Sequence, residues 1–328
     1  MKILITGAAG SLGTKLVYAL NELANNTPQE QSKHSIQGSP LKIFATDIKE
    51  SPFTETTHLS YQCLDLRSKD FHLWLEKIRP DKIVHLASIL QISKKMTREM
   101  AHDIDVVATK NLLEQSIKLG VDKFIVTTSG AAYGYYPENK DVITEERATK
   151  GNSDYFYSAH KAEVEAVMAE YRQNHPQLKQ VVFRPGAILG PDFHGPVVNL
   201  FQQKMIVGLL GYPGPFNFIW SEDIVDYIIE ALTTEITGEY NIAGDGTLSM
   251  SDIAKRLHKP YLPLPPWLIQ GALAIAKPLG LSQYGPEQVK FIKYRPVLAN
   301  DKIKKAFSHQ PRYTSQKALD AFLALNKY

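Results

Sequence analysis

Two residues spaced four apart could exchange a proton with a substrate hydroxyl. Tyr157 and Lys161 lie in the segment YSAHK, inside a helix that we predict over 154–171, and residues four apart share one helix face. A phenol with a pKa of about 10 is a poor proton shuttle at neutral pH. A nearby ammonium, together with oxidised nicotinamide, lowers that pKa. We therefore interpret Tyr157 as the general acid and base.

A serine hydroxyl completes the candidate catalytic set. Ser129 directly follows a strand predicted over 124–128, and doubly wound sheets bind their ligands at the carboxyl ends of the strands. We predict that Ser129 hydrogen-bonds the reacting oxygen and holds it near Tyr157. Two alternatives stay open: Ser129 caps a helix or turn, or the neighbouring Thr128 shares or takes over its role.

A glycine-rich turn connects the first predicted strand, Lys2–Thr6, to a helix predicted over 14–23. Gly7 permits the tight turn, Gly10 lets the backbone approach a pyrophosphate, and Gly13 lets helix and strand pack closely. The helix N-terminus offers free N–H groups and a partial positive charge to phosphates. This turn predicts dinucleotide binding; the alternative is an ordinary tight strand-to-helix turn.

An acid at the end of the second predicted strand favours NAD as the cofactor. Asp47 ends the strand 41–47, where a carboxylate can accept both ribose hydroxyls of an adenosine. The same carboxylate repels a 2′-phosphate, although the nearby Lys49 weakens this argument. A polar segment at 25–40, which we predict to be an exposed insertion, accounts for the long spacing from the glycines.

Strands and helices alternate over the first 183 residues, which indicates an α/β, Rossmann-type, doubly wound parallel sheet. We predict that 1–183 form an NAD-binding domain, to which 217–245 return, and that 184–216 and 246–328 form a smaller C-terminal substrate-capping region. The remaining strands are predicted at 59–64, 82–86 and 180–183, and the remaining helices at 71–78 and 102–119, the latter ended by Gly120.

The bulk composition excludes several partners. The chain has 328 residues with 37 basic and 34 acidic side chains, which predicts neither nucleic-acid nor membrane binding. Cys63 is its single cysteine, so an intrachain disulfide is impossible and a reducing compartment fits best. The sequence begins without a recognisable signal peptide. We expect a cytoplasmic protein.

The remaining residues of chemical interest have ordinary explanations. None of the ten histidines shows a metal-binding spacing, so we predict no metal. We interpret His85 as a hydrogen-bonded structural residue and His160 as a packing or surface residue. The proline-flanked apolar stretch 262–281 is too interrupted to span a membrane; it either walls a hydrophobic pocket or packs as a core helix.

These motifs together resemble the extended short-chain dehydrogenase/reductase family, also called the NAD-dependent epimerase/dehydratase family. The resemblance covers nearly the whole chain. It rests on TGAAGSLG (6–13), Asp47, Asp65-Leu66, HLAS (85–88), TTSGAAYG (127–134), YSAHK (157–161), RPGAILGP (184–191), WSEDIVD (220–226) and YNIAGDGTLSMSDIA (240–254).

The resemblance implies an enzyme in which Tyr157, Lys161 and Ser129 are catalytic. It also implies a homodimer formed through the helices 102–119 and 154–171. In the cofactor-binding set that it implies, Asp65 and Leu66 flank the adenine while Ala87 and Ser88 line the cleft; the set is Gly7, Gly10, Ser11, Leu12, Gly13, Asp47, Asp65, Leu66, Ala87, Ser88, Tyr157, Lys161 and Pro185. The substrate-binding set is Ser129, Gly130, Tyr157 and Gly186.

Two departures from the family pattern bear on the substrate. Nucleotide-sugar members carry Arg-Asp-Phe where this chain has Phe-Asn-Phe at 216–218, and Lys204 is the single Lys or Arg of 191–218. Asp105 replaces a common Asn, which shifts local hydrogen bonding. We therefore predict hydride transfer at a secondary alcohol or carbonyl of a small, apolar molecule. The alternative is a nucleotide-sugar epimerase or dehydratase with tightly bound NAD. A non-catalytic cofactor binder is disfavoured because the catalytic trio is intact.

Overall fold

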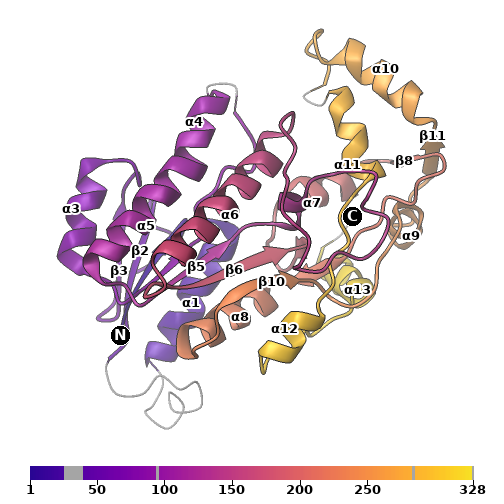
Figure 1. The fold of residues 1–328 in the computed structure, drawn as a ribbon. Coiled ribbons are helices and arrows are strands. Elements are labelled where there is room, and N and C mark those ends of the chain that lie inside the picture. The colour runs from indigo at the N-terminus through magenta and orange to yellow at the C-terminus, as the bar shows by residue number, and fades with distance from the viewer. Residues whose placement is uncertain (26–39, 94–95, 283–284, 327–328) are drawn as a thin grey trace.

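The computed structural model describes residues 1–25, 40–93, 96–282 and 285–326. The predicted insertion at 25–40 therefore lies almost entirely outside the described residues. Within them, a central sheet is covered by helices on both faces, and a smaller group of elements from the second half of the chain lies beside it (Figure 1).

Seven parallel strands form the central sheet in the order β10-β6-β5-β4-β1-β2-β3. The order reverses between β1 and β4, and such a switch point is where open α/β sheets bind ligands. The predicted doubly wound sheet is thus confirmed. The strands are β1 (Lys2–Thr6), β2 (Lys42–Asp47), β3 (Leu59–Cys63), β4 (Lys82–His85), β5 (Lys123–Thr127), β6 (Lys179–Pro185) and β10 (Gly238–Ile242).

Alternating side chains along the strands build a separate core on each face of the sheet. On β1, Ile3 and Ile5 pack with α1 (Ser11–Asn25) and α8 (Ser221–Thr233) on one face. Leu4 points to the opposite face. The helices of that opposite face are α3 (Lys69–Ile78), α5 (Ala108–Leu119) and α6 (Phe156–Asn174).

The helix predicted at 102–119 is longer and less regular than expected. It begins with α4 (Arg98–His102), continues through a π-helical turn η1 (Asp103–Val107) and runs on as α5. Gly120, with φ of 72°, ends it as predicted. Single π-helical turns often occur at functional sites, and this one places Asp105 in the interior beside α6.

A smaller region surrounds a third core that includes Phe201, Phe218 and Phe322. Two short parallel pairs belong to it, β7 with β9 and β8 with β11. The return of β10 to the main sheet agrees with the predicted return of 217–245; the full domain division stays a prediction. Outside this region, η2 (Gly130–Tyr133) contacts α6, and α12 (Asp301–Ala306) packs against β10. The elements of the smaller region are β7 (Ala187–Leu189), α7 (Pro196–Phe201), β8 (Ile206–Leu209), β9 (Phe218–Trp220), α9 (Met250–Arg256), β11 (Tyr261–Leu264), α10 (Pro266–Ala276), η3 (Pro286–Gln288), α11 (Val289–Lys293) and α13 (Ser315–Leu325).

The apolar stretch 262–281 forms β11, α10 and the segment that follows. None of the residues of α10 is buried, so the interpretation as a core-packing helix is wrong. That it walls a hydrophobic pocket stays a prediction. Among the described residues, no helix has both the length and the apolar content that crossing a bilayer requires.

Candidate active site

The glycine turn is too crowded for side chains at two of its three glycines. Gly7 has φ of 70°, and a Cβ there would lie 2.5 Å from the backbone nitrogen of Ala87. A Cβ at Gly13 would lie 2.2 Å from the carbonyl oxygen of Gly7. A Cβ at Gly10 would approach only that same oxygen, at 3.1 Å. The turn therefore leaves its outer side to a ligand, directly before Ser11 begins α1.

Two acids stand near the turn at the carboxyl end of the sheet. Asp47 accepts a hydrogen bond from the backbone N–H of Ala9 at 3.1 Å, so its carboxylate lies against the glycine turn; its contact with a ribose stays a prediction. Asp65 is occupied: Arg67 donates from Nε at 3.0 Å and from Nη2 at 2.7 Å. These bonds hold the pKa of Asp65 below its usual range. Sequence reasoning missed Arg67, which pairs with this predicted adenine contact.

A second strand end meets the turn and carries a polar atom suited to a ligand. Ala87 and Ser88 follow β4, and Ala87 touches Gly7. Ser88 Oγ is buried without a hydrogen-bond partner among the described residues. Because such an atom normally has a partner, its orphaned state fits a cofactor contact. Leu12 and Leu66, two other predicted cofactor contacts, are half-buried, and their contact with the cofactor stays a prediction.

The structure brings the predicted catalytic trio together. Tyr157 lies in the first turn of α6 and hydrogen-bonds Ser129, which follows β5. Lys161 Nζ lies 5.7 Å from the centre of the Tyr157 ring and donates to the carbonyl oxygen of Thr127 at 3.3 Å. A phenol, a hydroxyl and an ammonium therefore converge where β5 ends.

Burial dominates the electrostatics of this trio. It raises the pKa of Tyr157 above its usual value, and the hydrogen bond with Ser129 opposes the rise. Burial lowers the pKa of Lys161, opposed by the charges of Asp105 and Glu165. The protein groups alone thus do not produce the lowered phenol pKa that we expected from the sequence. The positive charge of an oxidised nicotinamide, when bound, would favour the phenolate.

The two open alternatives for Ser129 are resolved differently. Ser129 Oγ accepts from the backbone N–H of Ala131 at 3.1 Å, so Ser129 does cap η2. Its hydrogen bond with Tyr157 shows that capping and the site position coexist. Thr128 is buried and donates to Glu165 Oε1 at 2.6 Å. Thr128 is therefore engaged in the interior and not placed to replace Ser129.

The other predicted substrate and cofactor positions are packed turn residues. A Cβ at Gly130 would lie 3.0 Å from Leu298, and one at Gly186 would lie 2.9 Å from the carbonyl oxygen of Asn217. Pro185 ends β6 next to Gly186 and is buried. Gly130 and Gly186 therefore leave little room for a side chain, and the role of these positions in binding stays a prediction.

Both histidines near the site are structural, as the sequence analysis proposed. Thr109 donates to the carbonyl oxygen of Asp105, so it accepts from His85 Nε2 at 2.9 Å, and His85 Nδ1 accepts from Thr6 at 2.7 Å. Burial lowers the pKa of His85 to about 3. His160 is buried as well, with Nδ1 2.9 Å from Asp105 Oδ2.

An aromatic cluster beside Tyr157 was not predicted. Tyr155 lies 6.1 Å from Tyr157 between ring centres and packs at 4.2 Å against Phe291 of α11. Tyr135 lies 4.7 Å from Phe291 in the same cluster. Residues separated by more than 130 positions in the sequence therefore form one apolar wall next to the phenol.

Arg295 is the second feature that sequence reasoning missed. Its guanidinium carbon lies 3.9 Å from the centre of the Phe216 ring, and its Nε is buried without a hydrogen-bond partner among the described residues. Burial lowers the pKa of Arg295, opposed by Tyr135 and Tyr155. A distant segment thus supplies an arginine next to 216–218, which lack one. The sequence signal was a lone arginine between Tyr294 and a proline.

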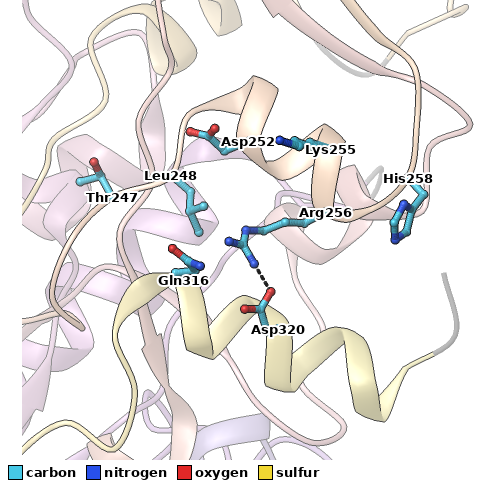
Figure 2. A pocket seen from close by; sticks show the side chains of 8 residues that line it. All are labelled: Thr247, Leu248, Asp252, Lys255, Arg256, His258, Gln316 and Asp320. Atoms are coloured by element: carbon cyan, nitrogen blue, oxygen red, sulfur yellow. Dashed lines mark hydrogen bonds and ion pairs between the residues drawn. The ribbon is translucent and has the colours of Figure 1, made fainter.

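Two other charged groups lie outside this site. A cavity of about 660 Å³ between α9 and α13 is lined by Lys255, Arg256 and Asp320, among others (Figure 2). Arg256 and Asp320 pair across it. In the second group, Asp223 and Asp226 both accept from Arg312, and His309 contacts Asp223. The ion pairs of each group are thus formed within that group.

Comparison with known proteins identifies the family. Residues 3–243 match the model of the NAD dependent epimerase/dehydratase family. The chain belongs to this family. It is therefore an NAD-dependent enzyme of the epimerase/dehydratase group, and the Ser88 hydroxyl and the glycine turn fit that cofactor.

Relatives at low identity cover most of the chain. Sterol demethylase protein B of Methylococcus capsulatus is 26% identical over 294 residues, covering 85% of this chain and 82% of the relative. UDP-glucose 4-epimerase of Yersinia enterocolitica is 25% identical over 244 residues, covering 70% of each. The two relatives carry different names, so the family assignment leaves the substrate open.

Solved structures confirm the fold. A UDP-glucose 4-epimerase of Thermotoga maritima, solved with UDP-glucose, superimposes with a TM-score of 0.72 at 18% identity, over 99% of this chain and 98% of the other. That of Thermus thermophilus, solved with NAD, gives a TM-score of 0.71 at 21% identity over the same shares. The architecture of the whole described chain is that of these enzymes.

Proposed function

We propose that this enzyme transfers hydride between NAD and a secondary alcohol or carbonyl on an apolar, sterol-like molecule that carries an acidic group. The observation that carries the proposal is the aromatic wall of Tyr135, Tyr155 and Phe291 beside the Tyr157 phenol. Apolar walls bury apolar substrates, and a few placed polar groups fix their orientation. The relative named sterol demethylase protein B supports the same substrate class.

The catalytic trio would divide the proton chemistry as follows. Tyr157 accepts the substrate hydroxyl proton during oxidation and returns it during reduction. Ser129 donates a hydrogen bond to the same oxygen and fixes its distance from the phenol. Lys161 stabilises the phenolate through its charge. Bound NAD supplies the hydride acceptor and the positive ring charge that favours the phenolate.

Arg295 supplies the argument for an acidic group on the substrate. Its guanidinium lies over the Phe216 ring, and its charge interacts with Tyr135 and Tyr155. Arg295 is half-buried as a whole, but its Nε is a buried hydrogen-bond donor without a partner among the described residues. An anion placed beside it would satisfy that donor. A carboxylate on an apolar substrate would fill this place with charge-assisted hydrogen bonds.

A second candidate is a nucleotide-sugar epimerase or dehydratase with tightly bound NAD. Arg295 favours it as well, because a diphosphate is an anion that a guanidinium binds in the same way. The relative from Yersinia enterocolitica and both solved structures are UDP-glucose 4-epimerases, which belong to this class. The two candidates differ in whether NADH accumulates: a dehydrogenase forms it during turnover, whereas an epimerase with tightly bound NAD shows no net formation.

The deciding experiment measures NADH formation by the purified chain. The panel would contain sterol alcohols with and without a neighbouring carboxylate, and UDP-glucose. NADH formation on a carboxylated sterol alcohol, lost in Tyr157→Phe, would support the dehydrogenase. Conversion of UDP-glucose without added NAD and without net NADH formation would support the epimerase instead of the dehydrogenase. If the chain binds NAD but turns over neither the sterol alcohols nor UDP-glucose, the result would support a non-catalytic cofactor binder.

We also propose the arrangement that the family resemblance implies for the whole molecule. Residues 1–183 and 217–245 would bind NAD, and 184–216 and 246–328 would bind the substrate. The helical segment 98–119 and α6 would form the contact of a homodimer. Light scattering of the purified chain tests the dimer directly.

A further inference from the structure

The helix α10 presents an apolar surface to solvent. Trp267 is 71% exposed and Ile275 is 65% exposed, and beyond the helix Leu279 and Leu281 are 65% and 79% exposed. Figure 1 shows α10 at the edge of the molecule, away from the central sheet. A contiguous apolar surface of this kind marks a binding site for a protein or a membrane.

The exposed residues are not confined to one side of α10. Exposed and partly buried positions follow the helical repeat, and the partly buried ones, Ile269, Leu273 and Ala276, fall on one narrow face. The exposed ones occupy more than half of the circumference: Trp267, Leu268, Gln270, Gly271, Ala272, Ala274 and Ile275. No charged side chain lies in Pro266–Ala276. A flat protein surface covers one side of such a helix, whereas lipid can surround it.

Basic residues flank this apolar segment. Residues 255–293 contain six Lys and Arg and one acidic residue, although the chain as a whole is nearly balanced. Three of them, Lys255, Lys259 and Lys293, make no ion pair within the described residues, although Lys259 donates to a backbone carbonyl oxygen and Lys293 lies over two tyrosine rings. Cationic residues around an apolar helix are the pattern that attracts anionic phospholipids. Trp267, at the N-terminal end of α10, is of the type enriched at the membrane–water boundary.

We propose that α10 and its basic flanks dock on a bilayer surface that contains anionic phospholipid. Eleven residues of helix extend about 16 Å, roughly half of the hydrocarbon thickness of a bilayer, so α10 lies in one leaflet and does not span. This inference replaces our sequence-based expectation of a protein without a membrane partner. It goes beyond the proposed function, because lipid binding can be measured without any substrate.

The docking surface is connected to the candidate active site through one short path. The partly buried face of α10 contacts η3 and α11. Phe291 of α11 belongs to the aromatic wall beside Tyr157. Docking therefore brings the apolar wall of the site close to the lipid, from which an apolar substrate would enter.

Vesicle flotation tests the proposal on the full chain. We expect binding to vesicles of phosphatidylcholine and phosphatidylglycerol at three to one, weaker binding to phosphatidylcholine alone, and weakening by salt. The double variant Ile275→Glu/Leu279→Glu should lower the partition at least ~10-fold. Leu73→Glu, on α3 and 54% exposed in the wild type, is the matched control and should bind like the wild type. Trp267 emission should shift to the blue on binding.

Two outcomes overturn the proposal. One is a wild-type chain that does not float with anionic vesicles. If light scattering then shows a dimer that the double variant converts to a monomer, a second copy covers α10. The other is a double variant that floats as well as the wild type. Neither outcome depends on turnover, so both remain distinct from a failure of the proposed function.

Discussion

Glu165 accepts a hydrogen bond from Thr128 at 2.6 Å and so connects the helix of Tyr157 and Lys161 to the strand end that carries Ser129. The carboxylate is buried and is held from its other side by the Arg184 guanidinium, whose Nε lies 2.8 Å from Oε2. The spacing of the catalytic trio therefore depends on an ion pair behind it that does not itself meet the substrate.

We expect Glu165→Ala to be strongly destabilising. The substitution leaves Arg184 buried without its carboxylate partner, and breaking a buried pair in this way costs about 3–5 kcal/mol of unfolding free energy. Urea denaturation measures the loss. The control is Asp320→Ala, which removes the partly exposed partner of Arg256 and should cost less than about 1 kcal/mol. Equal losses in the two variants would show that the buried pair has no special weight.

Tyr157→Phe should separate catalysis from cofactor binding. The variant keeps the ring and removes the proton that the phenol transfers, so turnover should fall at least ~100-fold while NAD affinity stays within a few fold. Steady-state kinetics and a fluorescence titration of NAD measure the two quantities. Unchanged turnover would remove Tyr157 from the mechanism, and a matching loss of NAD affinity would assign it a structural role.

The parts of this fold that follow from local pattern were predictable from the sequence. The apolar strands, the glycine turn and Gly120 at the end of α5 each reflect a few neighbouring residues, and each lies where the pattern predicts. The same holds for the placement of the candidate catalytic trio, since Tyr157 and Lys161 share a helix and Ser129 follows a strand that ends beside it.

The features that were missed depend on contacts between distant segments. Nothing local to Arg295 indicates that it lies over Phe216, 79 positions earlier. Asp65 and Arg67 are close in the sequence, but the ion pair between them depends on side-chain rotamers that the sequence does not specify. The exposure of α10 was also hidden, because an apolar run is typical of a core helix and only the tertiary arrangement shows that no core covers it.

His85 should make the protein less stable as the pH falls. Its folded pKa of about 3 lies below the unfolded value of about 6.5, so the unfolded chain binds more protons below pH 6.5. Protonation of His85 in the unfolded chain therefore lowers the free energy of unfolding as the pH falls from 6.5 towards the folded pKa. Between pH 8 and pH 5 this loss amounts to about 2 kcal/mol. Chemical denaturation at several pH values should show a smaller decline in His85→Gln.

The control for that series is His194→Gln, which changes an exposed histidine. It should leave the pH dependence of the wild type intact. A decline that is the same in His85→Gln and in the wild type would show that other groups cause the acid sensitivity.

Gly13→Ala should damage both the fold and the cofactor site. The added Cβ would lie 2.2 Å from the Gly7 carbonyl oxygen and 2.8 Å from Ala8 Cα, and these are backbone atoms that cannot move away cheaply. We expect a loss of about 1–3 kcal/mol in unfolding free energy and at least a ~10-fold rise in the Kd for NAD. Gly271→Ala is the matched control, because nothing lies within 4 Å of its Cβ position on α10. It should leave NAD binding unchanged and stability unchanged or higher by up to about 1 kcal/mol. If Gly13→Ala bound NAD like the control, the close contact of turn and helix would not be what shapes the cofactor site.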